Sequence, residues 1–162
     1  MAHTQHPTRN DIPAAKRTQL IELLNQNLLN LIDLYGQTKF AHWNVRGPHF
    51  IAYHELFDML AAGLPPLIDD TAERAAALGG VVNGTSRQVA AHSEVPEFPE
   101  GVHDGIAVVT ALADRYAKAG ASTRAAIDSA DKLEDKDSAD LFTGASRYLD
   151  KSLWFLEAHL SK

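Results

Sequence analysis

The connecting stretch VVNGTSRQVAAHSEVPEFPEG, residues 81–101, decides how this chain folds. It contains two prolines, scattered polar residues and one short segment, residues 86–91, that we expect to be helical. Neighbouring antiparallel helices are usually joined by only about two to eight residues. The stretch is therefore too long for a hairpin and predicts a crossover connection.

Two amphipathic segments precede this connection and two follow it. Apolar residues recur at steps of three and four, the spacing of a buried helix face, in segments that predict helices at residues 14–42, 50–78, 103–129 and 138–160. No segment alternates with a period of two over the length of a strand. The predicted fold class is all-α: a four-helix bundle with a long crossover that carries a short helix, of which the ferritin-like bundle is the best-known form.

The composition describes one globular domain. The chain has 162 residues, 45% of them hydrophobic and 22% charged, and its lack of cysteine excludes disulfides and thiolate metal sites. The net charge of −6 disfavours broad binding to nucleic acid and suits a protein that attracts cations. No apolar run approaches the ~20 residues of a membrane span, and an export signal is not apparent. We expect a cytoplasmic protein with a flexible tail at residues 1–13 and a bundle domain at residues 14–162.

The second predicted helix carries two pairs of metal-ligand side chains. His54 and Asp58 are four residues apart, as are Asp69 and Glu73, and at about 100° per residue all four share one face of an unbroken helix. The two pairs are separated by about 16 Å along the axis, whereas ligand atoms lie only ~2.0–2.2 Å from a metal ion. Either each chain holds two half-sites, or a second chain completes each one.

A two-fold axis between two copies of the chain resolves this separation. It can place His54 and Asp58 of one copy opposite the acidic pair of the other, which generates two sites per dimer. We expect His42, at the end of the first helix, to lie beside His54 in the same chain. Two histidines and three carboxylates form a mixed nitrogen and oxygen ligand set that suits Fe(II) and similar divalent metals.

A metal site inside the bundle is less well supported by the sequence. The internal site of a ferritin-like bundle takes Glu-x-x-His motifs from two helices, and the sequence offers one, from Glu100 to His103, where the connection meets the third helix. One copy at a helix boundary does not build that site. A site between subunits is what remains if this bundle handles iron.

The sequence GLPP, residues 63–66, lies between the two ligand pairs. Proline inside a helix costs about 3 kcal/mol and kinks the helix, and Pro66 disfavours a helical conformation at Pro65. We therefore expect a break or a 3₁₀ turn at residues 63–66 that leaves each ligand pair on an intact helical segment.

The chain resembles the Dps family, the dodecameric mini-ferritins of bacteria. The runs that carry the resemblance are KFAHWNVRGPHFIAYHELFD (39–58), DDTAERAAALGG (69–80), DRYAKAG (114–120) and ASRYLDKSLWFLE (145–157). The similarity covers nearly the whole chain from about Thr8 onward. It implies a hollow shell of twelve subunits, built from two-fold dimers, that oxidises Fe(II), preferably with hydrogen peroxide, and stores the ferric mineral inside.

The resemblance also implies a set of iron ligands at the dimer interface. They correspond to His42, His54, Asp58, Asp69 and Glu73, and each position holds the residue type that the family requires. Taken alone, each pair on the second helix is a surface pair at i and i+4. Together with His42 and the surrounding motif, the pairs favour a ferroxidase site.

Three further residues have two explanations each. Trp43 is either an interface aromatic or, as the family suggests, an oxidisable ring beside the site that takes up stray oxidising equivalents. The acidic run DKLEDKDSAD, residues 131–140, is a solvated turn in which Asp137 or Ser138 caps the fourth helix. The family instead suggests that acidic residues of this region, for which Asp140 and Asp150 are the candidates, line pores that draw Fe(II) inward.

Two functions from different classes follow. The first is an iron-oxidising and iron-storing enzyme, a ferroxidase that uses hydrogen peroxide. The second is a nucleoid-binding protein that protects DNA and has a vestigial ferroxidase site. The first fifteen residues contain Arg9 as their only Lys or Arg side chain, offset by Asp11, so we expect DNA binding to be weak at physiological salt.

Overall fold

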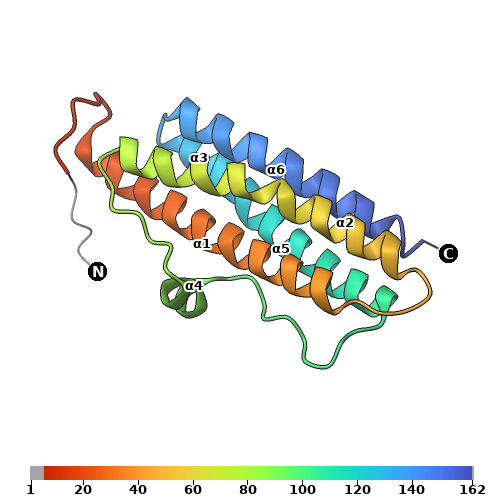
Figure 1. Ribbon diagram of the computed structural model, residues 1–162. Helices are drawn as coiled ribbons and strands as arrows, with labels where there is room; N and C mark the ends of the chain where they lie inside the picture. Colours follow the sequence, from red (N-terminus) through yellow and green to blue (C-terminus); the bar gives the residue numbers. More distant parts are fainter. Residues whose placement is uncertain (1–5, 162) are drawn as a thin grey trace.

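The computed structural model describes residues 6–161, which form six helices (Figure 1). Their bounds are α1 Ala14–Asn44, α2 Phe50–Ala62, α3 Leu64–Ala77, α4 Ser86–His92, α5 Gly105–Lys132 and α6 Lys136–Glu157. Helices α2 and α3 lie end to end, so that four rods make up the bundle (Figure 1). No strand forms in the described part of the chain. The predicted all-α, ferritin-like four-helix bundle is confirmed.

The predicted crossover is also confirmed. Residues 78–104 join α3 to α5, and α4 lies outside the bundle beside α1 (Figure 1). Thr85 and Gln88 form a capping box that starts α4. Buried Arg115 on α5 donates from Nε to Gln37 Oε1 at 3.0 Å, and Gln37 Nε2 donates to the carbonyl oxygen of Pro96 at 3.0 Å. This chain of hydrogen bonds holds the crossover against α1 and α5.

Two groups of buried apolar side chains fill the interior between the rods. One contains Leu34, Phe57, Leu112, Tyr116 and Leu149, and the other contains Leu20, Leu24, Leu78, Ala130 and Phe142. Burying a large apolar side chain stabilises the fold by about 1.5–3 kcal/mol. None of the described helices is long and apolar enough to cross a membrane.

The predicted break in the second rod falls at Gly63. This residue is itself right-handed helical, with φ −85° and ψ −10°, and α3 resumes at once with Pro65 and Pro66 in its first turn. Prolines are tolerated there because the first N–H groups of a helix have no partner within it. Tyr148 on α6 donates its hydroxyl to the carbonyl oxygen of Leu60 at 2.6 Å. The break is therefore a tight junction that α6 supports.

The segment before α1 lies at the end of the bundle where α3 ends (Figure 1). The His6 N–H donates to the carbonyl oxygen of Gly79 at 2.8 Å, and Arg17 Nη1 donates to that of Ile12 at 2.6 Å. Residues 1–5 of the predicted tail lie outside the described residues. The mobility of residues 1–13 stays a prediction.

Candidate metal centre

His42 and His54 hold each other in place by reciprocal hydrogen bonds. Their rings stack with centroids 3.7 Å apart and planes 22° apart. His42 Nδ1 lies 2.8 Å from the carbonyl oxygen of His54, and His54 Nδ1 lies 2.9 Å from that of His42. A carbonyl oxygen only accepts, so each Nδ1 carries a proton, and Nε2 is the ring nitrogen whose lone pair can bind a metal.

Asp58 is the third candidate ligand on α1 and α2. It lies one turn after His54, and its side chain is 58% exposed. Its Oδ1 is 3.9 Å from His42 Nε2, and two atoms bound to one ion at ~2.1 Å are at most about 4.2 Å apart. His42 Nε2 and Asp58 Oδ1 are therefore close enough to bind one divalent ion. We call His42, His54 and Asp58 the first half-site.

Lys39 also reaches this group, and the sequence interpretation did not single it out. Its Nζ donates to Asp58 Oδ1 at 2.6 Å. This hydrogen bond is the main reason why the pKa of Asp58 lies below its ordinary value of 3.8. The available signal was spacing, because Lys39 precedes His42 by one helical turn and so lies on the same face of α1.

Asp69 and Glu73, the second half-site, lie on α3 beyond the Gly63 junction. Both are exposed, and neither has a hydrogen-bond or ion-pair partner within residues 6–161. Across those residues, no group of three His, Asp or Glu side chains is arranged so that it could hold a metal ion. The structure places His42 against His54 and Asp58 beside His42, and Asp69 and Glu73 lie apart from them on α3.

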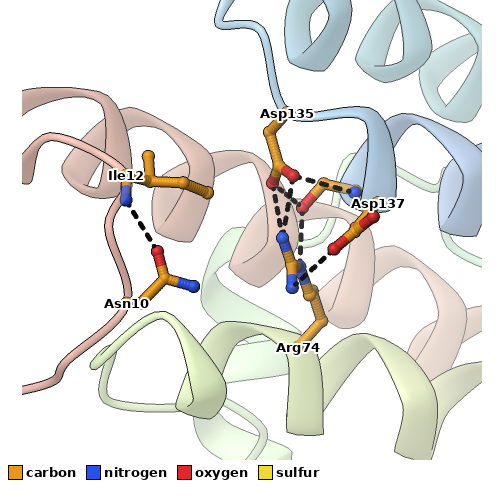
Figure 2. A network of polar contacts seen from close by, with 6 residues as sticks. Asn10, Ile12, Arg74, Asp135 and Asp137 are labelled. Atoms are coloured by element: carbon orange, nitrogen blue, oxygen red, sulfur yellow. Dashed lines mark hydrogen bonds and ion pairs between the residues drawn. The ribbon is translucent and has the colours of Figure 1, made fainter.

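Arg74, next to Glu73, fixes α3 to the turn before α6 (Figure 2). Its Nη2 donates to both carboxylate oxygens of Asp135, at 2.8 and 2.9 Å, and its Nε donates to Ser138 Oγ at 3.0 Å. Asp135 is only 3% exposed. Burial raises the pKa of Asp135, but hydrogen bonds from Arg74 and Ser138 outweigh it and hold that pKa below the ordinary value.

The cap of the fourth helix corrects the sequence interpretation. Asp135 caps α6 by accepting from the Ser138 backbone N–H, so neither Asp137 nor Ser138 is the cap. Asp and Ser both favour that position, so residue type does not distinguish the three candidates. Asp135 is selected because Arg74, 61 positions earlier in the chain, pairs with it.

Comparison with known proteins identifies the family. Residues 21–162 match the ferritin-like domain family. The chain is 42% identical over 157 residues to the DNA protection during starvation protein of Agrobacterium fabrum, which covers 97% of each chain. The chain belongs to the Dps family. The resemblance seen in the sequence is confirmed.

Solved Dps structures share the fold of this chain. DpsA14 from Streptomyces coelicolor superposes with a TM-score of 0.93 at 38% identity, over 99% of this chain and 95% of that chain. The tetragonal form of Mycobacterium smegmatis Dps gives a TM-score of 0.90 at 30% identity, over 96% and 95%.

The remaining candidates of this Dps chain lie on the surface. Trp43 is 62% exposed, and Lys39 Nζ lies 5.9 Å from the centre of its ring. Asp140 is exposed on α6, and Asp150, ten residues later on the same helix, forms an ion pair with Arg124. Ten residues of helix span about 15 Å, so the chain does not bring the two aspartates together. Their pore role and the redox role of Trp43 stay predictions.

Proposed function

We propose that this Dps chain is a cytoplasmic ferroxidase that oxidises Fe(II) with hydrogen peroxide, stores the ferric product and so protects the cell from oxidative damage. The observation that carries the proposal is the stacked histidine pair, whose Nε2 atoms remain available beside Asp58. Imidazole and carboxylate ligands together suit Fe(II). Iron is the substrate of this reaction.

The electron count favours two Fe(II) ions at each site. Two Fe(II) ions supply one electron each to one hydrogen peroxide, which takes up two protons and leaves as two water molecules. A single Fe(II) supplies one electron and would release a hydroxyl radical. Five ligand side chains, two of them bridging-capable carboxylates on α3, suit a pair of ions better than the three of the first half-site alone.

We further propose that two-fold dimers, assembled into a homododecamer, complete each site. The first half-site has a single carboxylate, and the second half-site would supply two more. The two half-sites are separated within a chain. Exposed apolar side chains adjoin the first half-site: Trp43 is 62%, Ile51 60% and Met59 51% exposed. Clusters of exposed apolar residues mark interaction surfaces, so this face of α1 and α2 suits a subunit contact.

The test is anaerobic Fe(II) loading followed by addition of hydrogen peroxide, monitored by ultraviolet absorbance. We expect rapid oxidation with two Fe(II) consumed per peroxide. Asp58→Ala removes a ligand and should abolish the rapid phase. Asp70→Ala is the matched control, because Asp70 is an exposed carboxylate beside Asp69 that lies outside the ligand set. Equal rates for both variants would contradict the assignment of Asp58.

Protection of DNA by direct binding is the alternative. It is favoured by the relatives from Agrobacterium fabrum and Deinococcus radiodurans, which are named DNA protection during starvation proteins. Among residues 6–13, Arg9 is the only Lys or Arg, and Asp11 offsets it, so binding that depends on phosphate contacts should be weak. A gel-shift assay at two salt concentrations tests this function. Strong DNA retention without iron oxidation would favour it over the ferroxidase.

A further inference from the structure

Lys39 is placed to compete with a metal ion for Asp58. It lies on α1 one turn before His42, and its side chain is 21% exposed. Its ammonium nitrogen is 2.6 Å from Asp58 Oδ1, the same oxygen that lies 3.9 Å from His42 Nε2. The ammonium group therefore occupies one coordination direction of the oxygen that the first half-site offers to a metal.

A divalent ion and the ammonium group at this oxygen would lie close together. The ion would sit ~2.0–2.2 Å from Oδ1, so the two positive charges would be within about 5 Å of each other. Like charges at such a distance repel appreciably near a protein surface. An arriving ion must therefore either displace Lys39 from Asp58 or bind less tightly than the ligand set alone allows.

We propose that Lys39 is a resident counter-cation of the first half-site, which a divalent metal displaces from Asp58, and that it sets the affinity and selectivity of the site. This inference rests on the proposed function, because it takes Asp58 as an iron ligand. The ammonium group offsets the charge of Asp58 before metal arrives. A monovalent cation gains little by replacing it, whereas a divalent ion also gains His42 and His54 as nitrogen ligands.

Trp43 provides a spectroscopic readout of this displacement. The indole ring lies 5.9 Å from Lys39 Nζ, a distance within the range of cation–π contacts. Movement of the ammonium group away from Asp58 changes the environment of the ring. The chain has two tryptophans, so Trp154→Phe leaves Trp43 as the only indole fluorophore.

The affinity experiment uses Zn(II), which is not oxidised, with the full-length assembled protein in a calorimetric titration. Lys39→Met removes the charge and keeps a long apolar stem, and we expect it to bind Zn(II) about tenfold or more tightly with unchanged stoichiometry. Lys39→Arg keeps the charge and should not gain affinity. Lys16→Met is the matched control, since Lys16 is also an α1 lysine paired with a carboxylate, Glu134, away from the half-site.

The fluorescence experiment follows Trp43 in the Trp154→Phe background during the same titration. We expect Zn(II) to change the emission of Trp43 when Lys39 is present, and the change to be largely lost in Lys39→Met. Gel filtration and circular dichroism identical to the parent protein would show that the variants retain the assembly and fold.

The outcomes separate this inference from the proposed function. Zn(II) binding that Asp58→Ala abolishes but Lys39→Met leaves unchanged or weakens would overturn the role of Lys39 alone. Tighter binding by Lys39→Met without any Lys39-dependent change in Trp43 emission would overturn the displacement. If Asp58→Ala binds Zn(II) as the parent protein does, Asp58 is not a ligand and both the inference and the proposed site fail.

Discussion

His42 and His54 orient each other through main-chain carbonyl groups, and no carboxylate takes part in those two hydrogen bonds. The orientation of each ring therefore depends on the backbone of the other residue, and so on how α1 and α2 are joined. Because the two side chains act as a unit, the effects of replacing them singly should not add. A change in either ring should therefore disturb the Nε2 atoms of both candidate ligands.

Asp135 gives a prediction about single-residue stability. A pKa held below 3.8 in the folded chain means that the ionised carboxylate stabilises the fold above that pH, and that this contribution is lost as the pH falls through the folded pKa. We expect Asp135→Asn to lower the free energy of unfolding by roughly 2–4 kcal/mol at pH 7. The difference from the parent protein should shrink below pH 3.8.

Urea unfolding at pH 7, 4 and 3, at one protein concentration, measures this effect. Asp137→Asn is the control, because Asp137 is 82% exposed and lies 3.7 Å from Arg74 Nη1. Asp137→Asn should lower the free energy of unfolding by at most about 1 kcal/mol, because exposed ion pairs contribute no more than that. Equal losses for the two variants would show that burial of Asp135 does not set the strength of its pairing.

Helix faces could be predicted from the sequence, whereas some individual side-chain contacts could not. The spacing of His54, Asp58, Asp69 and Glu73 predicts which residues share a helix face, because helical geometry is regular. Spacing does not predict that Lys39 donates to Asp58, since a long flexible side chain can reach several acceptors. The reciprocal bonds of His42 depend on the conformation of residues 45–49, which no residue periodicity specifies.

At the scale of helices, the junction at Gly63 is the feature that packing decides. A Cβ atom on Gly63 would clash with the ring and the hydroxyl group of Tyr148. Gly63 is right-handed helical, so helix propensity alone predicts that Gly63→Ala stabilises the chain by about 1 kcal/mol. We expect the opposite, a loss of roughly 1–2 kcal/mol, because the methyl group overpacks the contact with α6.

A double-mutant cycle with Tyr148→Ala tests this explanation. Without the ring, Gly63→Ala should be neutral or stabilising, and denaturant unfolding measures all four proteins. Gly36→Ala serves as a control, because a Cβ atom there would meet nothing within 4 Å among residues 6–161 outside its own helix backbone. The same cost of Gly63→Ala in both backgrounds would exclude the clash with Tyr148.

The helices themselves were predictable because each buries a continuous apolar face. The predicted segments at residues 14–42 and 138–160 correspond to Ala14–Asn44 and Lys136–Glu157. The predicted segment at 50–78 corresponds to two helices. The prolines predict where the helix is interrupted. They do not predict that the interruption is a single residue, because this depends on Gly63 staying helical and on a hydroxyl group supplied by α6.

At the scale of the assembly, complementation tests whether sites are shared. Asp58→Ala and Glu73→Ala should each be inactive in peroxide-driven Fe(II) oxidation. In a mixed two-fold dimer, one site combines both defects and the other is intact. With random pairing, half of the dimers are mixed and one of their two sites works, so refolded mixtures should recover about a quarter of the parent activity.

Recovery near zero would contradict sharing, because sites contained within one chain would all stay defective. Both variants should elute from gel filtration as the parent protein does, far above the chain mass of 17.7 kDa. A monomeric parent protein would contradict the interface, since each chain would then hold two incomplete half-sites.

The junction between α2 and α3 also limits how the length of this chain can change. In the proposed dimer, the second rod carries ligands for two different sites, with the first half-site before Gly63 and the second after it. Inserting or deleting one residue at the junction would turn the acidic pair by about 100° around the rod axis. Both sites of a dimer would lose alignment together, although every ligand remained present. The number of residues between Asp58 and Asp69 is therefore constrained more strictly than the amino-acid types of those intervening residues.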